Sequence, residues 1–439
     1  MKHSIVSKFL ELWHHPKRGE YKLVVLSSSF FFCLLCAYFI LRPLRDEMGI
    51  ENGAVNMQWL FTGTFLTMVC LVPIFGFLVS KNSIKNLMIY VYTFFLANLL
   101  VFYYFFETHG PSRVLAIIFF IWLSVFNLFI VSLFWSFMAD VFHSMAAKKF
   151  FGIIAAGGSL GALTGPAIAR GLSGWASFAP LLLAGCFFLG VGLCCVLWIL
   201  KLSPRKNHFK QEKQNFKGSA SAIFEGVQQI TKSSYLMGIV GFILLYTSIS
   251  TILYFEQAHL VEQTLLESTE RIRYFSNIDL TVNGIAIFGQ FFLTARIIKR
   301  IGLSFVLASI PFVMGLGLVF LGFHPALGIV AVLMVLHRAG NFTLLRPGRE
   351  ILFTVTSTSE KYKSKNCIDT AVYRGGDALV GWAFSGLVAL GWGLGAIAFL
   401  AIPLAFLWSF LGFKLGNQHL EKENIVPLKQ IHYENKIQS

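Results

Sequence analysis

The sequence predicts an all-α integral membrane protein with twelve transmembrane helices in two six-helix bundles, and three observations lead to this fold class. Of the 439 residues, 56% are hydrophobic and only 13% are charged, whereas soluble domains carry about 25% charged residues. The mean hydropathy is +0.68. The apolar residues are gathered into long runs, and 46 phenylalanines and nine tryptophans are typical of a lipid-facing surface with aromatic belts at its interfaces.

Runs of apolar residues define the expected spans. A helix needs about 20 such residues to cross roughly 30 Å of hydrocarbon. Twelve runs of this kind can be placed, at approximately residues 23–41, 57–79, 87–106, 114–141, 151–172, 179–200, 236–257, 278–298, 303–321, 325–354, 368–390 and 394–415. The predicted domains are therefore an N-terminal arm (1–22), a six-helix bundle (23–200), a basic linker (201–234), a second bundle (235–415) and a tail (416–439).

Basic residues alternate between successive loops. The N-terminal arm, the linker, the tail and every second loop are basic, whereas the loops between them are short or acidic. Because basic loops stay on the cytoplasmic side, we expect a multi-pass protein of the bacterial inner (cytoplasmic) membrane with both termini in the cytoplasm. The same distribution explains the net charge of +15 without a nucleic-acid partner.

Three charged residues lie deep inside apolar runs of the second half. Arg338 falls in the tenth run, and Arg374 and Asp377 fall in the eleventh. A charged side chain near the bilayer centre costs about 2.5 to 3.5 kcal/mol, so such residues usually face a bundle interior or a watery cavity. We expect these three, with Asn341, to bind an anionic solute, because a guanidinium can hold phosphate or carboxylate with two hydrogen bonds. A purely structural salt bridge between Arg374 and Asp377, which share a helix face, stays open.

Other charged residues lie near the ends of the runs. Arg42, Arg45 and Asp46 follow the first run, and they either bind the solute or belong to an interfacial loop. Glu256 and Asp279 flank an acidic outer loop and are expected to be solvated. A further group is expected to act as a gate or in coupling, and it consists of Asp140, Lys148, Arg346, Arg349, Glu350 and Asp369.

The two halves of the chain resemble each other as an internal repeat would. Glycine pairs at 157–158 and 375–376 hold the same place in the fifth and eleventh runs. Two parallel six-helix repeats are the organisation of major facilitator transporters, in which the solute site lies between the halves near the bilayer midplane. The predicted cytoplasmic turns at 76–85 and 299–302 resemble basic turns of that superfamily, and this resemblance implies an inward gate closed by ionic contacts.

Three stretches resemble the ATP/ADP translocase family of bacterial parasites and plastids. The first, at the end of the first run, comprises Ile40-Leu41-Arg42 with Arg45-Asp46. The second, between the fourth and fifth runs, comprises Phe134-Trp135, Asp140 and Ala147-Lys148-Lys149-Phe150. The third, in the tenth and eleventh runs, comprises Arg349-Glu350, Lys361, Lys363, Lys365, Ile368-Asp369 and Arg374. The chain has Arg45 where the family usually has a lysine. The resemblance covers both halves and implies exchange of nucleotides across a membrane.

We therefore expect a secondary active transporter, working as a monomer, that moves an anionic small molecule through an alternating-access central cavity, with nucleotide exchange as the specific case. A proton-coupled facilitator for another metabolite, a siderophore or a drug is an alternative, and so is a membrane-embedded lipid-modifying enzyme. The sequence has no P-loop, and its seven cysteines lack metal-ligand spacing. We expect neither catalysis nor a metal or other cofactor.

Overall fold

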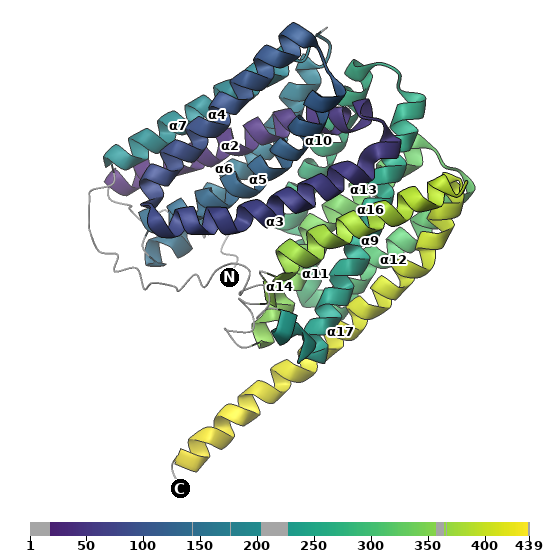
Figure 1. Cartoon of the computed structure of the whole chain (residues 1–439). Helices are drawn as coiled ribbons and strands as arrows, with labels where there is room; N and C mark the ends of the chain where they lie inside the picture. Colours follow the sequence, from purple (N-terminus) through teal and green to yellow (C-terminus); the bar gives the residue numbers. More distant parts are fainter. Residues whose placement is uncertain are drawn as a thin grey trace. The chain divides into compact units, whose positions relative to one another are not determined.

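The computed structural model describes residues 18–142, 144–175, 177–202, 227–356, 364–365 and 367–437. It describes their side chains except at 18–20, 79–80, 144–149, 370 and 424–437. All regular secondary structure in these ranges is helical (Figure 1). The predicted all-α fold class is confirmed.

Long helices joined by short turns form the first half of the chain. The hydroxyl of Ser83 accepts a hydrogen bond from the backbone N–H of Asn86, and that of Ser112 accepts one from Leu115, so each serine caps the helix that follows it. The elements are α2 (Arg18–Glu51), the 3-10 helix η1 (Ala54–Asn56), α3 (Met57–Lys81), α4 (Ile84–His109), α5 (Arg113–Val141), α6 (Ser144–Leu172) and α7 (Ala179–Leu202).

The second half contains more interrupted helices. Two π-helices, η2 (Asn341–Leu345) and η4 (Ile368–Val372), lie in the expected tenth and eleventh spans. The other elements are α9 (Ser234–Thr264), α10 (Ser268–Phe292), α11 (Thr294–Ile301), α12 (Leu303–Phe323), α13 (Leu327–Gly340), α14 (Arg346–Leu352), the 3-10 helix η3 (Phe353–Val355), α16 (Tyr373–Ala389) and α17 (Leu394–Ile437).

The helices account for the twelve expected spans. Within the described residues, ten helices are long and apolar enough to cross a membrane, and α10 with α11 passes the same test as a pair bent by 58°. The remaining span is α16, which has 17 residues and continues from the five residues of η4 without a gap.

Helices α2 and α10 extend well beyond the apolar runs that predict them. The first run ends near residue 41, but α2 continues to Glu51. The eighth begins near residue 278, but α10 starts at Ser268. Both extensions carry charged side chains that are buried against other helices, as described below. A hydropathy profile underestimates the length of such helices because paired charges, rather than apolar residues, fill the interface at their ends.

The chain divides into two compact units. Unit 1 consists of Met1–Met48, Phe75–Phe216 and Glu267–Leu280, and unit 2 consists of Gly49–Ile74, Lys217–Leu266 and Thr281–Ser439. The beginning of α10 thus belongs with unit 1, and most of α3 belongs with unit 2. Each unit therefore contains a segment from the other sequence half. The domain boundaries expected at residues 200 and 235 stay a prediction.

The core of unit 1 includes a close approach of α6 to α2. A Cβ atom added at Gly161 would lie 2.2 Å from the carbonyl oxygen of Phe32, and one added at Gly157 would lie 2.4 Å from that of Ser28. No side chain fits in this contact. The glycines therefore allow the two backbones to pack directly, as small residues do between membrane helices.

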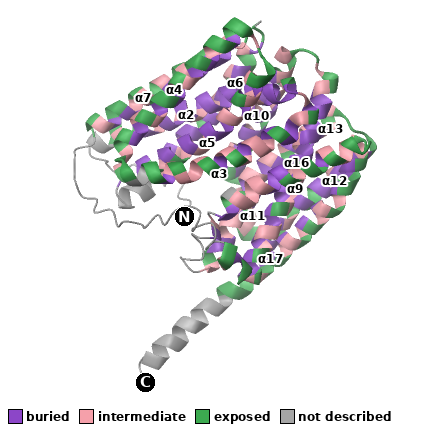
Figure 2. Ribbon diagram, viewed as in Figure 1, coloured by how far each residue is buried: buried purple, intermediate pink, exposed green. Residues whose placement is uncertain are grey.

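In unit 2, α9 packs against α13, α16 and α17. Trp408 of α17 is fully buried, with its ring centroid 5.7 Å from that of Phe242. Gly376 of α16 meets the side chain of Thr247. In both units the buried residues lie where helices meet, and many outward residues are exposed large hydrophobic side chains (Figure 2). This pattern is the one expected of helices surrounded by lipid.

Candidate functional site

In unit 2, Tyr246 of α9 joins the two helices that carry the deep arginines. Its ring stacks on that of His337, with centroids 5.0 Å apart and planes at 17°. Its hydroxyl accepts a hydrogen bond of 3.4 Å from the hydroxyl of Tyr373. His337 immediately precedes Arg338 on α13, and Tyr373 immediately precedes Arg374 on α16. One buried tyrosine therefore fixes the residue next to each arginine.

Arg374 and Asp377 form the ion pair that their spacing predicts. The Nη1 atom of Arg374 lies 3.7 Å from Oδ2 of Asp377, and the two side chains are 35% and 11% exposed. The other carboxylate oxygen of Asp377 accepts a 3.1 Å hydrogen bond from Thr251 on α9. Asp377 is thus anchored on both sides, whereas a third of the Arg374 side chain remains accessible to a solute.

The π-helices lie next to these residues along the chain. η2 begins at Asn341, three residues after Arg338, and η4 ends at Val372, two residues before Arg374. Arg338 and Asn341 are both half-buried. π-helical turns occur frequently at functional sites. The backbone irregularities of unit 2 therefore coincide with the residues that the sequence selects as solute ligands.

Two further ionic contacts bring together four residues, two near the end of the tenth span and two at the start of the eleventh. Arg349 lies 3.4 Å from Asp369. The ammonium of Lys365 donates a 2.6 Å hydrogen bond to Glu350. These contacts connect α14 to the segment that leads into α16. Three of the expected gate residues therefore take part in ion pairs with one another or with this lysine.

The other three residues expected to act as a gate lie on separate elements of the fold. Arg346 is exposed at the start of α14, and Asp140 is exposed near the end of α5. The side chain of Lys148 lies outside the described residues. The gate role of all these residues stays a prediction.

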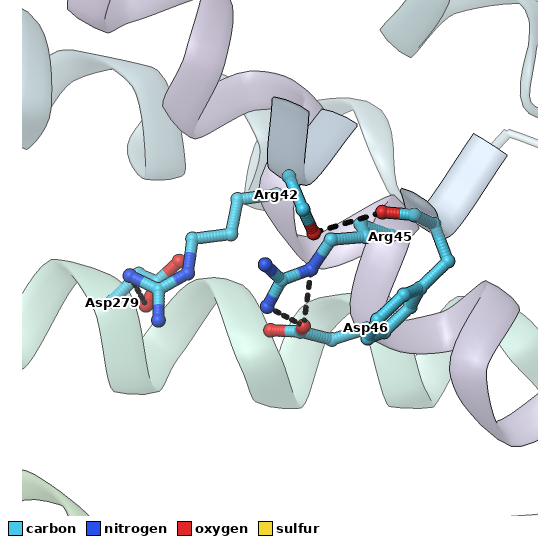
Figure 3. Close-up of polar contacts among 6 residues, drawn as sticks. Arg42, Arg45, Asp46 and Asp279 are labelled. Carbon is cyan, nitrogen blue, oxygen red and sulfur yellow. Dashed lines mark hydrogen bonds and ion pairs between the residues drawn. The ribbon is translucent and has the colours of Figure 1, made fainter. Parts of the chain in front are cut away.

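The charged end of α2 lies in a network with the beginning of α10, inside unit 1. Arg42 lies 3.3 Å from Asp279, whose side chain is 1% exposed. Arg45 donates two hydrogen bonds to the neighbouring Asp46, from Nε at 3.0 Å and from Nη2 at 2.5 Å. Figure 3 shows Arg42 directed toward Asp279 and Arg45 directed toward Asp46. These side chains are therefore part of a packed helix interface and do not form an interfacial loop.

A further ion pair completes this network. Glu47 is fully buried, and its Oε1 atom accepts a 3.4 Å hydrogen bond from Arg271 of α10. The guanidinium of Arg45 also lies over the ring of Phe120, 5.0 Å from its centroid. α2 and α10 thus each contribute an acid and a base to the crossed pairs that join them.

The expectation that Glu256 and Asp279 are solvated is wrong. Glu256 is 0% exposed and Asp279 is 1% exposed. The helices α9 and α10 extend past the apolar runs, so both acids lie within helix interfaces. Sequence reasoning also missed Arg271 as the partner of Glu47. The available signal was the presence of both charge signs at the adjoining ends of two spans, but only the fold identifies the partners.

The helical spans, the buried charge pairs and the interrupted helices together define a multi-pass membrane protein of the transporter class. The chain belongs to the Major Facilitator Superfamily, whose sequence pattern matches residues 32–346. This family indicates a transporter rather than an enzyme. A search of curated proteins finds no match.

Solved transporter structures share this fold at low sequence identity. The POT family transporter PepTSo has a TM-score of 0.65 at 13% identity, covering 92% of this chain and 99% of that one. For the human organic anion transporter TETRAN, the TM-score is 0.56 at 16% identity, with 91% and 100% covered. For the nucleoside transporter NupG, it is 0.55 at 12% identity, with 92% and 100% covered. These likenesses establish the fold alone.

Proposed function

We propose that this chain is a secondary active transporter that carries an anionic small molecule, with Arg338 and Arg374 as its principal ligands. The observation that supports this most directly is the position of Tyr246, which contacts the residue before each arginine. Two arginines that each follow a residue in contact with Tyr246 are suited to a solute with two or more oxygen acceptors, such as a phosphate or a carboxylate.

Alternating access would require contacts between the two sequence halves to break. The crossed pairs between α2 and α10 are contacts of this kind within unit 1. In unit 2, the hydroxyl of Ser385 on α16 donates a 2.9 Å hydrogen bond to Gln58 on α3, and Trp382 donates one of 2.9 Å to Thr62. We infer that these two groups of contacts hold one state of the transport cycle closed.

We propose nucleotide exchange as the specific activity. The resemblance to ATP/ADP translocases includes Arg42, Asp46 and Arg374, which lie in the ion pairs described above. Transporters for an organic anion and for a nucleoside are among the structures with this fold. A nucleotide would satisfy the arginines through its phosphates.

Counterflow in proteoliposomes tests this proposal. Vesicles with purified protein and internal ADP should take up labelled ADP faster than vesicles without it, because exchange needs a solute on both sides. Arg338→Ala and Arg374→Ala should remove this acceleration. Arg296→Ala is the matched control, since Arg296 is exposed on α11.

The outcomes separate the broad proposal from the specific one. Lack of ADP uptake, together with thermal stabilisation by another phosphorylated metabolite or carboxylate, would overturn the nucleotide activity and retain the anion carrier. Uptake that both arginine variants support at the normal rate would overturn the assignment of the ligands.

A further inference from the structure

Helices α12 and α17 lie side by side in unit 2 (Figure 1). Near the start of α12, the hydroxyl of Ser304 donates a 2.7 Å hydrogen bond to the side chain of Asn417. Near its end, a Cβ atom at Gly322 would meet the ring of Phe399. The two helices are therefore antiparallel, and the beginning of α12 lies level with the part of α17 around Asn417.

A groove of about 550 Å³ follows the contact between these two helices. Five of its nine lining residues are phenylalanines. Phe305 meets Phe413 edge to face, with ring centroids 5.2 Å apart, and Phe312 meets Phe406 in the same way at 5.7 Å. Ligand-binding pockets have volumes of about 300 to 1,000 Å³, so the groove is large enough to hold part of a small molecule.

The lining of the groove suits a hydrocarbon chain. Its two hydroxyl groups are already engaged, because Ser309 donates a 3.0 Å hydrogen bond to the carbonyl oxygen of Val306 and Ser409 donates one of 2.9 Å to that of Ala308. From Ile301 the groove extends about 16 Å along α12, at 1.5 Å per residue. This length is about half of the 30 Å hydrocarbon core of a bilayer, and therefore about one leaflet.

Basic side chains lie at one end of the groove. The last turn of α11 carries Lys299 and Arg300, and Arg300 directly precedes Ile301, which lines the groove. On α17, Lys414 follows the lining residue Phe410 by one helical turn. All three basic residues are exposed. Because the helices are antiparallel, Arg300 and Lys414 flank the same end.

The sequence places no acidic residue beside this positive end on the helices that form it. α11 and α12 contain neither aspartate nor glutamate, and the first acid of α17 is Glu421, about two turns beyond Lys414. Helix α11 is also amphipathic, with three isoleucines on one side and its basic residues on the other. Basic amphipathic helices are typical of membrane interfaces and attract anionic lipids. The groove therefore combines an apolar trough with a positive end.

We propose that the groove between α12 and α17 binds an anionic phospholipid. One acyl chain packs against the phenylalanine rings, and the head-group phosphate accepts hydrogen bonds from Arg300 and Lys414. A guanidinium group can donate two hydrogen bonds to the same phosphate. The head group of phosphatidylcholine carries a positive charge that the basic end repels, so the site selects a lipid with a net negative charge. Lipid binding here does not require transport of any particular solute.

Native mass spectrometry of the full-length protein in detergent tests this selectivity. Given equal amounts of phosphatidylglycerol and phosphatidylcholine with the same acyl chains, the protein should retain mainly phosphatidylglycerol. Arg300→Gln with Lys414→Gln should weaken phosphatidylglycerol binding about 30-fold, because each basic residue near an anionic lipid contributes about a fivefold gain in affinity. Equal retention of both lipids by the wild-type protein would overturn the proposal.

A second double variant separates a local site from general attraction. Lys85→Gln with Lys232→Gln removes the same charge from two exposed positions away from the groove, and it should bind phosphatidylglycerol like the wild-type protein. If the two double variants bind this lipid equally well, the attraction is not local and the proposal is wrong. Thermal unfolding of each variant shows whether a loss of binding reflects a loss of folded protein.

Photolabelling locates the acyl chain in the wild-type protein without any substitution. Phosphatidylglycerol with a photoactivatable group in its acyl chain should label mainly peptides that contain residues 303–313 and 403–413. Ser309→Trp fills the groove at an exposed position and should remove this labelling. Labelling spread evenly over all lipid-exposed helices would overturn the proposal.

Two other occupants of the groove give different results. Inorganic phosphate in excess should not displace the labelled lipid, because it lacks the chain that the groove holds. Displacement by phosphate would assign the basic end to a free anion. A dimer in the native mass spectrum that disappears in Ser309→Trp would assign the groove to a second copy of the chain. Either result would overturn the lipid site.

Discussion

The guanidinium of Arg42 lies 3.3 Å from the carboxylate of Asp279. This contact joins the first and eighth spans inside one compact unit, although the two residues come from different halves of the sequence. Asp279 is 1% exposed, so Arg42 compensates a carboxylate that has little access to water. The pair is therefore both a structural contact and a candidate control point in transport.

Breaking this pair from one side should destabilise the protein strongly. Arg42→Ala leaves a buried carboxylate without this partner, which costs about 3 to 5 kcal/mol. Asp279→Asn should have a similar effect, whereas the double variant Arg42→Gln with Asp279→Asn should recover much of the loss. Thermal unfolding in detergent measures the effect, with the exposed Arg273→Ala as control. Additive losses in the double variant would contradict the pairing.

Arg374 should matter for solute affinity more than for stability. Its side chain is 35% exposed, and Asp377 keeps its hydrogen bond from Thr251 when the arginine is removed. Loss of a charged hydrogen bond is worth about 1.5 to 3 kcal/mol, so Arg374→Ala should weaken solute binding roughly 10- to 150-fold. Arg374→Lys should be intermediate, because it keeps the charge and loses the planar fork. Binding is measured by titration calorimetry, and normal affinity in Arg374→Ala would make the Asp377 pair purely structural.

Two substitutions of Tyr246 test its contacts with His337 and Tyr373, the residues that precede the two arginines. Tyr246→Phe removes only the hydroxyl contact with Tyr373 and should cost about 0.5 to 1.5 kcal/mol, while the stacking on His337 remains. Tyr246→Ala removes the whole ring from a buried site and should cost about 3 to 5 kcal/mol, by analogy with other buried aromatic residues. Thermal unfolding and transport rate should fall in the same order. Equal losses in both variants would show that the hydroxyl dominates.

The close contact between α6 and α2 predicts a sharp difference between two glycines of one helix. Gly161→Ala places a Cβ atom 2.2 Å from a backbone oxygen of α2, whereas nothing lies within 4 Å of a Cβ atom at Gly152. Gly161→Ala should therefore lower the unfolding temperature by several degrees, since overpacking costs about 1 to 3 kcal/mol. Gly152→Ala should be neutral or slightly stabilising. Equal unfolding temperatures would contradict the packing.

Crosslinking tests whether the contact between α3 and α16 must open during transport. Cysteines introduced at Gln58 and Ser385, whose side chains are joined by a 2.9 Å hydrogen bond, should react with a short bifunctional reagent in a background without the native cysteines. The crosslinked protein should lose counterflow, and reduction should restore it. Continued counterflow after complete crosslinking would exclude opening at this contact.

The spans and the pairing of Arg374 with Asp377 could be predicted from the sequence. Both depend on local periodicity, because a hydrophobic run sets a helix and a spacing of three residues sets a shared face. The membrane class of the protein followed from composition alone. These features require no knowledge of which helices are neighbours.

The partners of buried charges could not be predicted in the same way. Asp279 and Glu256 both follow or precede polar loop residues, and hydropathy assigns them to water. In the fold, Asp279 meets Arg42 from a distant helix, whereas neither carboxylate oxygen of Glu256 has a hydrogen-bond partner among the described residues. The two π-helices were also missed, since no composition rule distinguishes their five-residue segments from ordinary helix.

The π-helices have a consequence for how the arginines can move. A π-turn holds one residue more than an α-turn, so converting η2 or η4 into α-helix shifts the following residues by one position. Such a shift rotates a side chain about 100° around the helix axis, without unwinding the span. η4 directly precedes Tyr373 and Arg374, so converting η4 alone into α-helix would rotate this arginine around the helix axis. The tenth span, which contains Asn341 and η2, would keep its register. A carrier with this property could reorient its solute ligand by a rearrangement of only a few hydrogen bonds.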